Sequence, residues 1–240
     1  MNFELSGLEP TKNNFGYMHP KSFLMNEFIS FSKNVSQPVL DIGSAYGVAT
    51  IQCLKEGAQV ISCDICNDHL TLLVDRTPVE LRKNLKIMNL RFPYETKFLD
   101  NSLSAVFLSH VLSFLEIEEI EFGIKKIYDW LEVSGKIFIL NYTPYYKTLK
   151  NFIPIYQERI AEDIKWPGFI EDKRKFIDKI RSSDNVPNRL NLMDIPILKE
   201  LAEKNGFKIN MLKYFGGVEA GVPEPFCLDG REWVGMIATK

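Results

Sequence analysis

The sequence lacks the features that mark several large classes of protein. Its four cysteines, Cys53, Cys63, Cys66 and Cys227, are too few and too unevenly spread for a disulfide framework in a chain of 240 residues. No apolar run approaches the length of a membrane span, and the N-terminus has neither the basic start nor the apolar core of a signal peptide. We therefore expect a cytoplasmic protein that does not associate with membranes.

The chain also lacks an excess of charge of either sign. Its 29 Lys and Arg residues against 31 Asp and Glu residues give a formal net charge of −2, which provides no broad basic surface for nucleic acid. Nucleic acid is therefore not expected as a partner. No repeat, low-complexity tract or linker divides the chain, so we expect a single domain over residues 1–240.

Metal chemistry has little support in the sequence. The stretch CDICNDH places Cys63, Cys66 and His69 at spacings that a metal or redox site could use, but no second Cys pair or His cluster completes a zinc site. We therefore expect no metal, and we interpret these cysteines as small apolar residues around the end of a strand. No Ser-His-Asp triad or pair of catalytic carboxylates is recognisable either.

The most informative segment is VLDIGSAYGVAT, residues 39–50. Its β-forming start and the helical spacing of Val48, Ile51 and Leu54 predict a strand, a Gly-rich turn and a helix. Helix N-termini expose unpaired amides, and small residues in the turn let a ligand approach the backbone. We expect a nucleotide or nucleoside to bind here; the alternative is a tight strand-to-helix turn without a ligand.

The same segment disfavours a dinucleotide. The nicotinamide fingerprint G-x-G-x-x-G is missing, because the pattern here is Asp41-x-Gly43-x-Ala45-x-Gly47. Asp41 places a carboxylate at the strand end, where it repels a pyrophosphate and attracts a cation. The turn is therefore predicted to bind a ligand that has no phosphates and carries an amine or a sulfonium.

This pattern resembles the first motif of the class I S-adenosylmethionine-dependent methyltransferases (type 11/25-like), usually E/D-x-G-x-G-x-G. It departs at the middle glycine, which Ala45 replaces, and the change matters if this position requires a positive φ. The stretch FLDNSLSAVFLSH is similar to the family's segment before its fourth strand: Asp100 and Ser102 match, whereas Ser104 replaces a common aspartate. The resemblance covers residues 36–240.

The resemblance implies an α/β fold, a Rossmann-like, doubly wound sheet of seven mostly parallel strands with an antiparallel last strand. The patterns place these strands within residues 39–42, 57–65, 85–90, 104–110, 132–142, 207–215 and 231–239. Further helices are predicted to begin after the N-cap Thr77, to cover residues 117–131, and to run from Asp194 to Asn205. A turn is expected at the start of the 132–142 segment.

Two segments are predicted to lie outside this alternation. Residues 1–35 are expected to form an N-terminal helical segment, in which FGYMHPKS is a candidate to fold over the cofactor. The alternative for FGYMHPKS is a simple helix entry with Pro20 near the first turn. Residues 144–190 are expected to form a helical insertion, with two helix-like runs around KWPGF, and are a candidate substrate lid. The alternative for the insertion is a peripheral decoration or a dimer contact.

The resemblance also implies the cofactor S-adenosylmethionine, with S-adenosylhomocysteine as its product. Asp64 follows the second strand at the spacing expected of a carboxylate that binds the ribose hydroxyls, and Asn89 would lie near the adenine. The implied cofactor-binding residues are Asp41, Gly43, Ser44, Ala45, Gly47, Asp64, Ile65, Asn89, Leu90, Ser109 and His110.

The function implied is methyl transfer to a small molecule or a protein side chain. His110 is the first candidate for a general base and His19 the second, and Tyr17, His19 and Tyr142 are candidate acceptor contacts. One alternative is a cofactor fold that has lost catalysis and serves as an interaction protein, which the departures at Ala45 and Ser104 support. An NAD-dependent enzyme is a weaker alternative. The acceptor and the oligomeric state are beyond the sequence.

Overall fold

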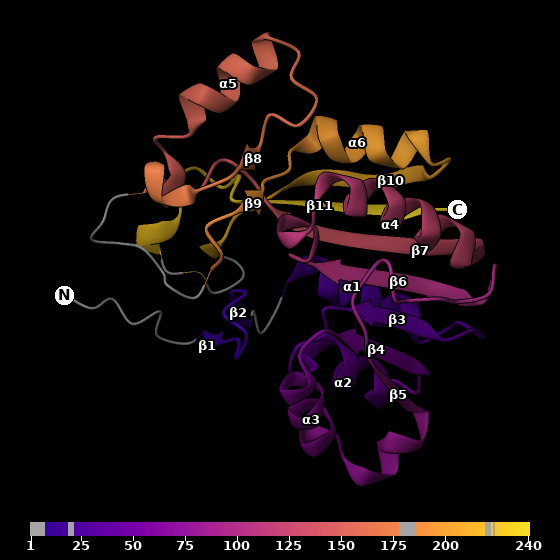
Figure 1. Cartoon of the computed structure of the whole chain (residues 1–240). Helices are drawn as coiled ribbons and strands as arrows, with labels where there is room; N and C mark the ends of the chain where they lie inside the picture. The colour runs from indigo at the N-terminus through magenta and orange to yellow at the C-terminus, as the bar shows by residue number, and fades with distance from the viewer. Residues whose placement is uncertain (1–7, 19–21, 178–185, 219–221, 223) are drawn as a thin grey trace.

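A computed structural model gives the chain a single seven-stranded sheet with helices on both faces (Figure 1). The structure describes residues 8–18, 22–177, 186–218, 222 and 224–240. The strand order is β10-β11-β7-β6-β3-β4-β5. The strands are β3 Val39–Ile42, β4 Val60–Asp64, β5 Leu85–Asn89, β6 Leu103–Ser109, β7 Leu131–Tyr142, β10 Lys208–Phe215 and β11 Trp233–Thr239.

The pairing of the strands confirms the expected fold. The pairs β3–β4, β4–β5, β3–β6 and β6–β7 are parallel, whereas the last strand, β11, is antiparallel to both β7 and β10. All residues of β3 and nearly all of β6 are buried, because helices cover both faces of the sheet centre. Their continuous apolar sequences follow from this burial.

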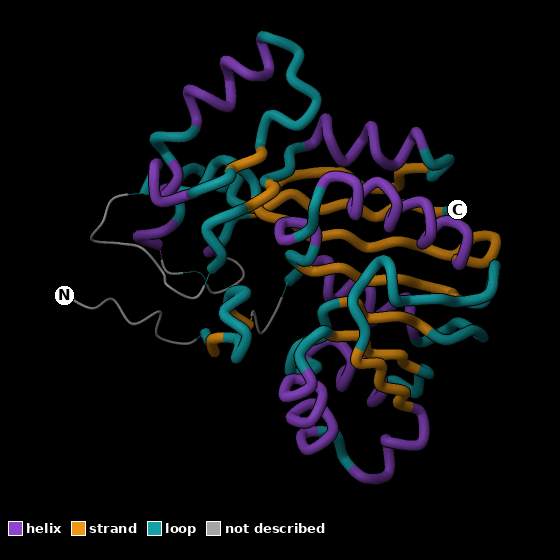
Figure 2. Tube along the Cα trace, viewed as in Figure 1, coloured by secondary structure: helices purple, strands orange, loops and turns teal. Residues whose placement is uncertain are grey.

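Two helices cover each face of the central strands. The helices α1 Phe23–Ser32 and α2 Val48–Lys55 share one apolar core with the sheet, and α4 Ile117–Trp130 and α6 Ile195–Lys204 share the other. The helix α3 Asn67–Arg76 packs on β4 and β5. Figure 2 shows the strands in orange between these helices.

The helix α4 forms as its apolar spacing predicts. Ile120, Ile124 and Ile127 are fully buried against the sheet. A capping box between Glu116 and Glu119 begins the helix. The helix ends one residue before the predicted end, because Leu131 already belongs to β7.

Two local predictions were wrong. Thr77 does not begin an α-helix: it ends α3, where its hydroxyl donates to the Leu73 carbonyl, and only a short 3₁₀ helix, η1 Val79–Asn84, follows. This 3₁₀ helix buries none of its residues, so no apolar face stabilises a longer helix. The turn expected before the fifth strand is part of β7, which begins at Leu131 and changes register against β6 near Ala105.

The N-terminal segment is only partly helical. Before α1, strand β1 Glu9–Pro10 pairs with β2 Tyr17–Met18 in an antiparallel hairpin that was not expected from the sequence. We call residues 8–18 the N-terminal hairpin. Ser22 then caps α1 by accepting from the Met25 amide at 3.1 Å.

The insertion has a small core of its own, made by Leu149, Phe152, Tyr156, Ile170, Leu190 and their neighbours. Of its two expected helical runs, the first forms α5 Ile153–Ala161, and the described part of the second forms only a 3₁₀ turn. Its other elements are η3 Lys147–Leu149, β8 Phe169–Ile170, η4 Lys173–Lys175 and β9 Leu190–Asn191. Two further 3₁₀ turns, η2 Leu112–Phe114 and η6 Glu224–Phe226, flank β6 and β11.

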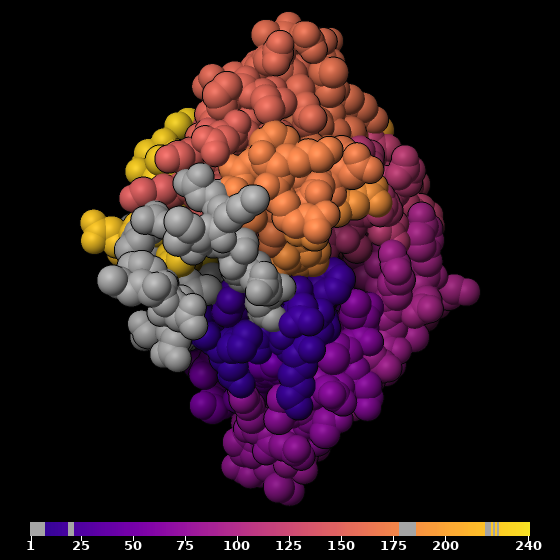
Figure 3. Space-filling model, turned by 60° about the vertical axis from the view of Figure 1, so that its left-hand side comes forward, coloured from indigo at the N-terminus to yellow at the C-terminus, as the bar shows by residue number. Residues whose placement is uncertain are grey.

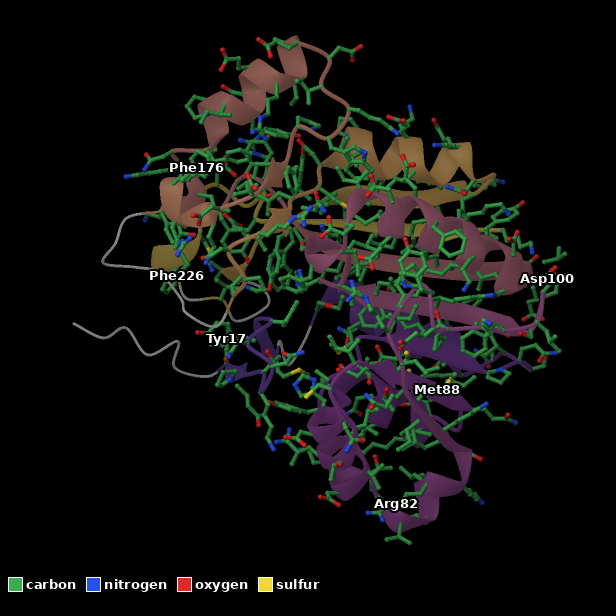
Figure 4. The ribbon with its side chains drawn as sticks, viewed as in Figure 1. Tyr17, Arg82, Met88, Asp100, Phe176 and Phe226 are labelled. Atoms are coloured by element: carbon green, nitrogen blue, oxygen red, sulfur yellow. The ribbon has the colours of Figure 1, made fainter. Side chains whose placement is uncertain are left out.

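The N-terminal hairpin and the β8–β9 pair both lie where the parallel strands end (Figure 1). In the space-filling view, the indigo surface of the N-terminal segment borders the orange surface of the insertion (Figure 3). Tyr17 lies at this edge, whereas Asp100 of the family-like FLDNS segment lies at the opposite end of the sheet (Figure 4). Within the described ranges, no helix has the length and apolar character needed to cross a membrane.

Candidate functional site

A cavity lies at the carboxyl ends of the parallel strands, where open α/β sheets bind their ligands. Its wall comes from segments far apart in the sequence: the N-terminal hairpin, the turns after β3 and β4, the segment after β5, and the ends of β6 and β7. The sequence-predicted residues in this wall are Tyr17, Asp41, Gly43, Ser44, Ala45, Asp64, Ile65, Leu90, Ser109, His110 and Tyr142. Two other predicted residues, Gly47 and Asn89, are not among the lining residues, and the predicted His19 lies outside the described residues.

The two glycines of the turn are required by its packing. Gly43 and Gly47 have φ values of +68° and +80°, which glycine adopts most readily. A Cβ at Gly43 would lie 2.5 Å from Val111 Cγ2, and one at Gly47 would lie 2.5 Å from Leu73 Cγ. Gly47 therefore caps α2 and makes room for α3.

The middle position of the turn carries backbone strain. Ala45 has a φ of +43°, in the left-handed region that favours glycine, and its amide donates to Asp64 Oδ2 at 2.9 Å. The neighbouring Ser44 hydroxyl is buried and has no hydrogen-bond partner among the described residues. A buried hydroxyl without a partner in a cavity wall indicates a place for a polar group of a ligand.

Asp41 is less charged than the sequence interpretation assumed. Its carboxyl is 3% exposed and accepts from the Thr50 hydroxyl at 2.7 Å. Burial, assisted by the nearby charge of Asp64, raises the pKa of Asp41 to about 7. At neutral pH the charged form is therefore present with the neutral form, and a cationic ligand would favour the charged one.

Asp64 connects the two turns that flank the cavity. Its carboxylate accepts from the Ala45 amide at 2.9 Å, from the Cys66 amide at 2.8 Å and from His69 Nδ1 at 3.1 Å. Both Asp64 and His69 are buried, with exposed fractions of 6% and 1%. Cys66, which the sequence grouped with His69 as a weak metal candidate, therefore takes part through its backbone.

One end of the cavity is largely apolar. Ile65 follows β4 and is 54% exposed, and Leu90 follows β5 in the same wall. The Arg91 guanidinium also lines this end and pairs with Glu119 at 2.8 Å. Asn89 is not in this wall: its side-chain amide donates to the Asp64 carbonyl at 2.9 Å and joins β5 to β4, and its expected place near the adenine stays a prediction.

The other end of the cavity is aromatic. His110 follows β6 with a φ of +61°, and its ring stacks on Tyr142 with the ring centres 4.0 Å apart. Phe114 lies edge-on to Tyr142 and to Phe15 of the N-terminal hairpin. Burial raises the pKa of the Tyr142 hydroxyl, so this phenol stays neutral at ordinary pH.

The N-terminal hairpin is held over the cavity by contacts at its base. The Tyr46 hydroxyl donates to the Pro10 carbonyl at 2.9 Å, and Arg76 of α3 forms a bidentate pair with Glu9 at 2.8 and 3.1 Å. The sequence interpretation did not place Thr11, Asn13 and Phe15 of the hairpin at the site, nor His69 of α3 and Phe114 of η2, which also line the cavity. In this region, only Tyr46 had a local signal for a place near the site, because it lies between Ala45 and Gly47 in the Gly-rich turn.

Part of the chain matches a known family. Residues 39–135 match the family described as "Methyltransferase domain". The matched region begins at β3 and ends in β7, so it includes the Gly-rich turn, Asp64 and His110. The N-terminal hairpin and the insertion lie outside it.

Known proteins resemble the chain over different spans. Over 103 residues, or 42% of this chain, the sequence is 34% identical to phosphoethanolamine N-methyltransferase 1 of Triticum aestivum, and the match spans only 20% of that protein. A SAM-dependent methyltransferase structure from Methanosarcina mazei covers 89% of this chain and 96% of its own, with a TM-score of 0.63 and 16% identity. The glycopeptide N-methyltransferase MtfA, complexed with S-adenosylmethionine, covers 90% and 91%, with a TM-score of 0.60 and 15% identity.

Proposed function

We propose that this chain, a member of the class I S-adenosylmethionine-dependent methyltransferases, transfers a methyl group from S-adenosylmethionine to a small molecule. The observation that carries the proposal is the cavity in which the Gly-rich turn, the Asp64 carboxylate and the aromatic wall meet. The family and its cofactor are those that the sequence resemblance implies. The acceptor and the roles of individual residues are our proposal.

The residues of the cavity fit this cofactor. The unpartnered Ser44 hydroxyl is suited to a polar group of the methionine part, and Asp64 is suited to the ribose. Ile65 and Leu90 offer apolar surface for the adenine. The G-x-G-x-x-G register that a pyrophosphate needs is missing, which disfavours a nicotinamide dinucleotide.

When bound, S-adenosylmethionine supplies a methyl group on a positively charged sulfur. The acceptor contributes the lone pair of the new bond, and the sulfur keeps the electrons of the bond that breaks. The protein's main tasks are then to hold the two reactants in line and to exclude water, which can supply much of the acceleration. Asp41 in its charged form favours the cation before transfer.

A small acceptor is favoured because the N-terminal hairpin covers part of the cavity. The N-terminal hairpin contributes Thr11, Phe15 and Tyr17 to its wall, and the insertion borders the hairpin at the surface (Figure 3). A side chain of a folded protein would have to pass this hairpin. We propose Tyr17 and Tyr142 as acceptor contacts, and an acceptor whose bound part is mainly apolar.

His110 is the proposed general base for an acceptor that must lose a proton. Its ring lines the aromatic end of the cavity and is 6% exposed. An acceptor with an available lone pair and no proton to lose would not need it. The second candidate base, His19, lies outside the described residues.

The test is calorimetric titration with S-adenosylhomocysteine, with NAD as the control ligand. We expect the wild type to bind with a dissociation constant in the micromolar range, which is a binding free energy of about −8 kcal/mol. We expect Asp64→Ala to bind at least tenfold more weakly. Asp68→Ala is the matched control, because Asp68 is exposed in the first turn of α3, next to His69. The proposal fails if the wild type does not bind, or if both variants bind equally well.

The acceptor class is tested with radioactive S-adenosylmethionine and a cell lysate separated into small-molecule and protein fractions. We expect label in the small-molecule fraction. Label only in the protein fraction would replace the small-molecule acceptor with a protein side chain and would leave the cofactor unchanged.

A further inference from the structure

Asp64 has little remaining capacity for hydrogen bonds. An ionised carboxylate offers about four lone-pair positions, and Ala45, Cys66 and His69 occupy three of them. Both positions on Oδ1 are used, so one position remains, on Oδ2. A ribose presents two neighbouring hydroxyls, each with one hydrogen to donate, and the second hydroxyl therefore needs another acceptor.

His69 carries an unused acceptor beside Asp64. A carboxylate oxygen only accepts, so His69 Nδ1 supplies the hydrogen of the bond between them, and in the neutral ring Nε2 then has a lone pair. This Nε2 is buried and has no hydrogen-bond partner among the described residues, although the His69 ring belongs to the cavity wall. A buried acceptor without a donor is destabilising, which indicates that a ligand supplies the donor.

The orientation of the His69 ring is set from two directions. Asp64 fixes Nδ1 at 3.1 Å, and Tyr46 lies edge-on to the ring with the centres 5.1 Å apart. Tyr46 is itself held by its bond to the Pro10 carbonyl. A reversed ring would place a carbon against Asp64 and lose the bond, so the surroundings maintain the tautomer with Nε2 as the acceptor.

We infer that Asp64 and His69 together accept the hydrogen bonds of the two ribose hydroxyls of the cofactor. Asp64 Oδ2 accepts from one ribose hydroxyl, and His69 Nε2 accepts from the other. The inference rests on the proposed function, because the ribose is that of S-adenosylmethionine. It makes His69 a cofactor-binding residue and changes the sequence expectation that Asp64 binds both hydroxyls.

The test compares three ligands: S-adenosylhomocysteine, its 2′-deoxy analogue and its 3′-deoxy analogue. Calorimetric affinities are measured for the wild type, His69→Phe and His69→Asn. Phenylalanine keeps a flat ring and removes both nitrogens. Asparagine keeps a donor near the position of Nδ1 and removes the acceptor at Nε2, so it separates binding of the ligand from support of Asp64.

We expect both variants to bind S-adenosylhomocysteine about tenfold more weakly, which is the usual size of one hydrogen bond in a buried site. One deoxy analogue should bind wild type and variants equally, because it lacks the hydroxyl that Nε2 accepts. The other analogue should keep the tenfold difference. This pattern cannot arise from a general loosening of the site.

Two results would overturn the inference. The first is unchanged S-adenosylhomocysteine binding in both variants, and the second is an equal loss for all three ligands. Neither result would contradict S-adenosylmethionine as the cofactor, provided that the wild type binds S-adenosylhomocysteine. A wild type that does not bind it would contradict the proposed function itself. Thermal unfolding confirms that each variant is folded, and His69→Asn carries the test if His69→Phe does not fold.

Discussion

At the scale of single residues, Asp41 couples the cofactor turn to pH. Burial raises its pKa from 3.8 to about 7, more than the hydrogen bond from Thr50 lowers it. The folded protein therefore holds a proton that the unfolded chain releases between these two values. The stability from this group is fully present below pH 3.8 and is lost as the pH rises through about 7.

Asp41→Asn should remove this pH dependence, because asparagine does not titrate and still offers an oxygen to Thr50. Relative to the variant, the free energy of unfolding of the wild type should fall by about 1.4 kcal/mol per pH unit between about pH 5 and 7, and level off above. Urea unfolding at several pH values measures the difference. Two curves that stay parallel from pH 5 to 8 would contradict the raised pKa.

Ala45 offers a second test at the scale of one residue. Because its φ is +43°, Ala45→Gly relieves backbone strain, and this gain offsets the greater freedom of glycine in the unfolded chain. We expect the free energy of unfolding to stay level or to rise by up to about 1 kcal/mol. Ala49→Gly is the matched control inside α2 and should lower it by about 1 kcal/mol. Equal losses in both variants, measured by urea unfolding, would argue against strain at Ala45.

At the scale of elements, the N-terminal hairpin and the insertion are fastened to the sheet in different ways. The hairpin uses the exposed Arg76–Glu9 pair and the Tyr46 hydroxyl. The insertion is connected through a buried carboxylate: Asp194 begins α6 and also accepts from Tyr156 at 2.8 Å. The hydroxyls of Tyr145 and Tyr214 bind the same carboxylate. We therefore expect the hairpin to open more easily than the insertion.

Arg76→Ala should loosen the hairpin with little effect on global stability. The Arg76 and Glu9 side chains are 41% and 49% exposed, so their pair contributes at most about 1 kcal/mol. We expect S-adenosylhomocysteine to dissociate up to about fivefold faster in stopped-flow measurements, and high salt to reduce the difference from the wild type. Lys125→Ala, which removes the exposed pair with Asp129 on α4, is the control and should leave the dissociation rate unchanged. If the two variants changed the dissociation rate equally, the Arg76–Glu9 contact of the hairpin would not control cofactor release.

At the scale of the whole molecule, the cavity joins the N-terminal hairpin to the ends of β3, β4, β6 and β7, so a ligand there should stabilise the entire fold. S-adenosylhomocysteine at 100 times its dissociation constant should add about 2.7 kcal/mol, because it binds only the folded state. For a domain of this size the gain corresponds to a rise in Tm of roughly 5–11 °C. Thermal scanning with NAD at the same concentration is the control. An equal shift with NAD, or no shift with S-adenosylhomocysteine, would contradict specific binding.

The sequence by itself determined the features that depend on local spacing. The strand, turn and helix of residues 39–55, the apolar stripe of α4 and the caps of α6 could be predicted, because each depends on residues a few positions apart. The family motif added the number of strands, the antiparallel last strand and the expected ligand edge in the same way, through short patterns. Where no apolar face supported a short signal, as after Thr77, the local prediction was wrong.

Only the tertiary structure decided which distant residues meet. The hairpin over the cavity, the use of the Asn89 amide by the Asp64 carbonyl, and the raised pKa of Asp41 all follow from contacts between separate elements. His69 is the clearest case, since the sequence offered it only as a weak metal candidate with Cys63 and Cys66 and predicted no metal, whereas folding places it beside Asp64. Burial and hydrogen-bond partners are properties of packing across the sheet edge, and no local pattern encodes them.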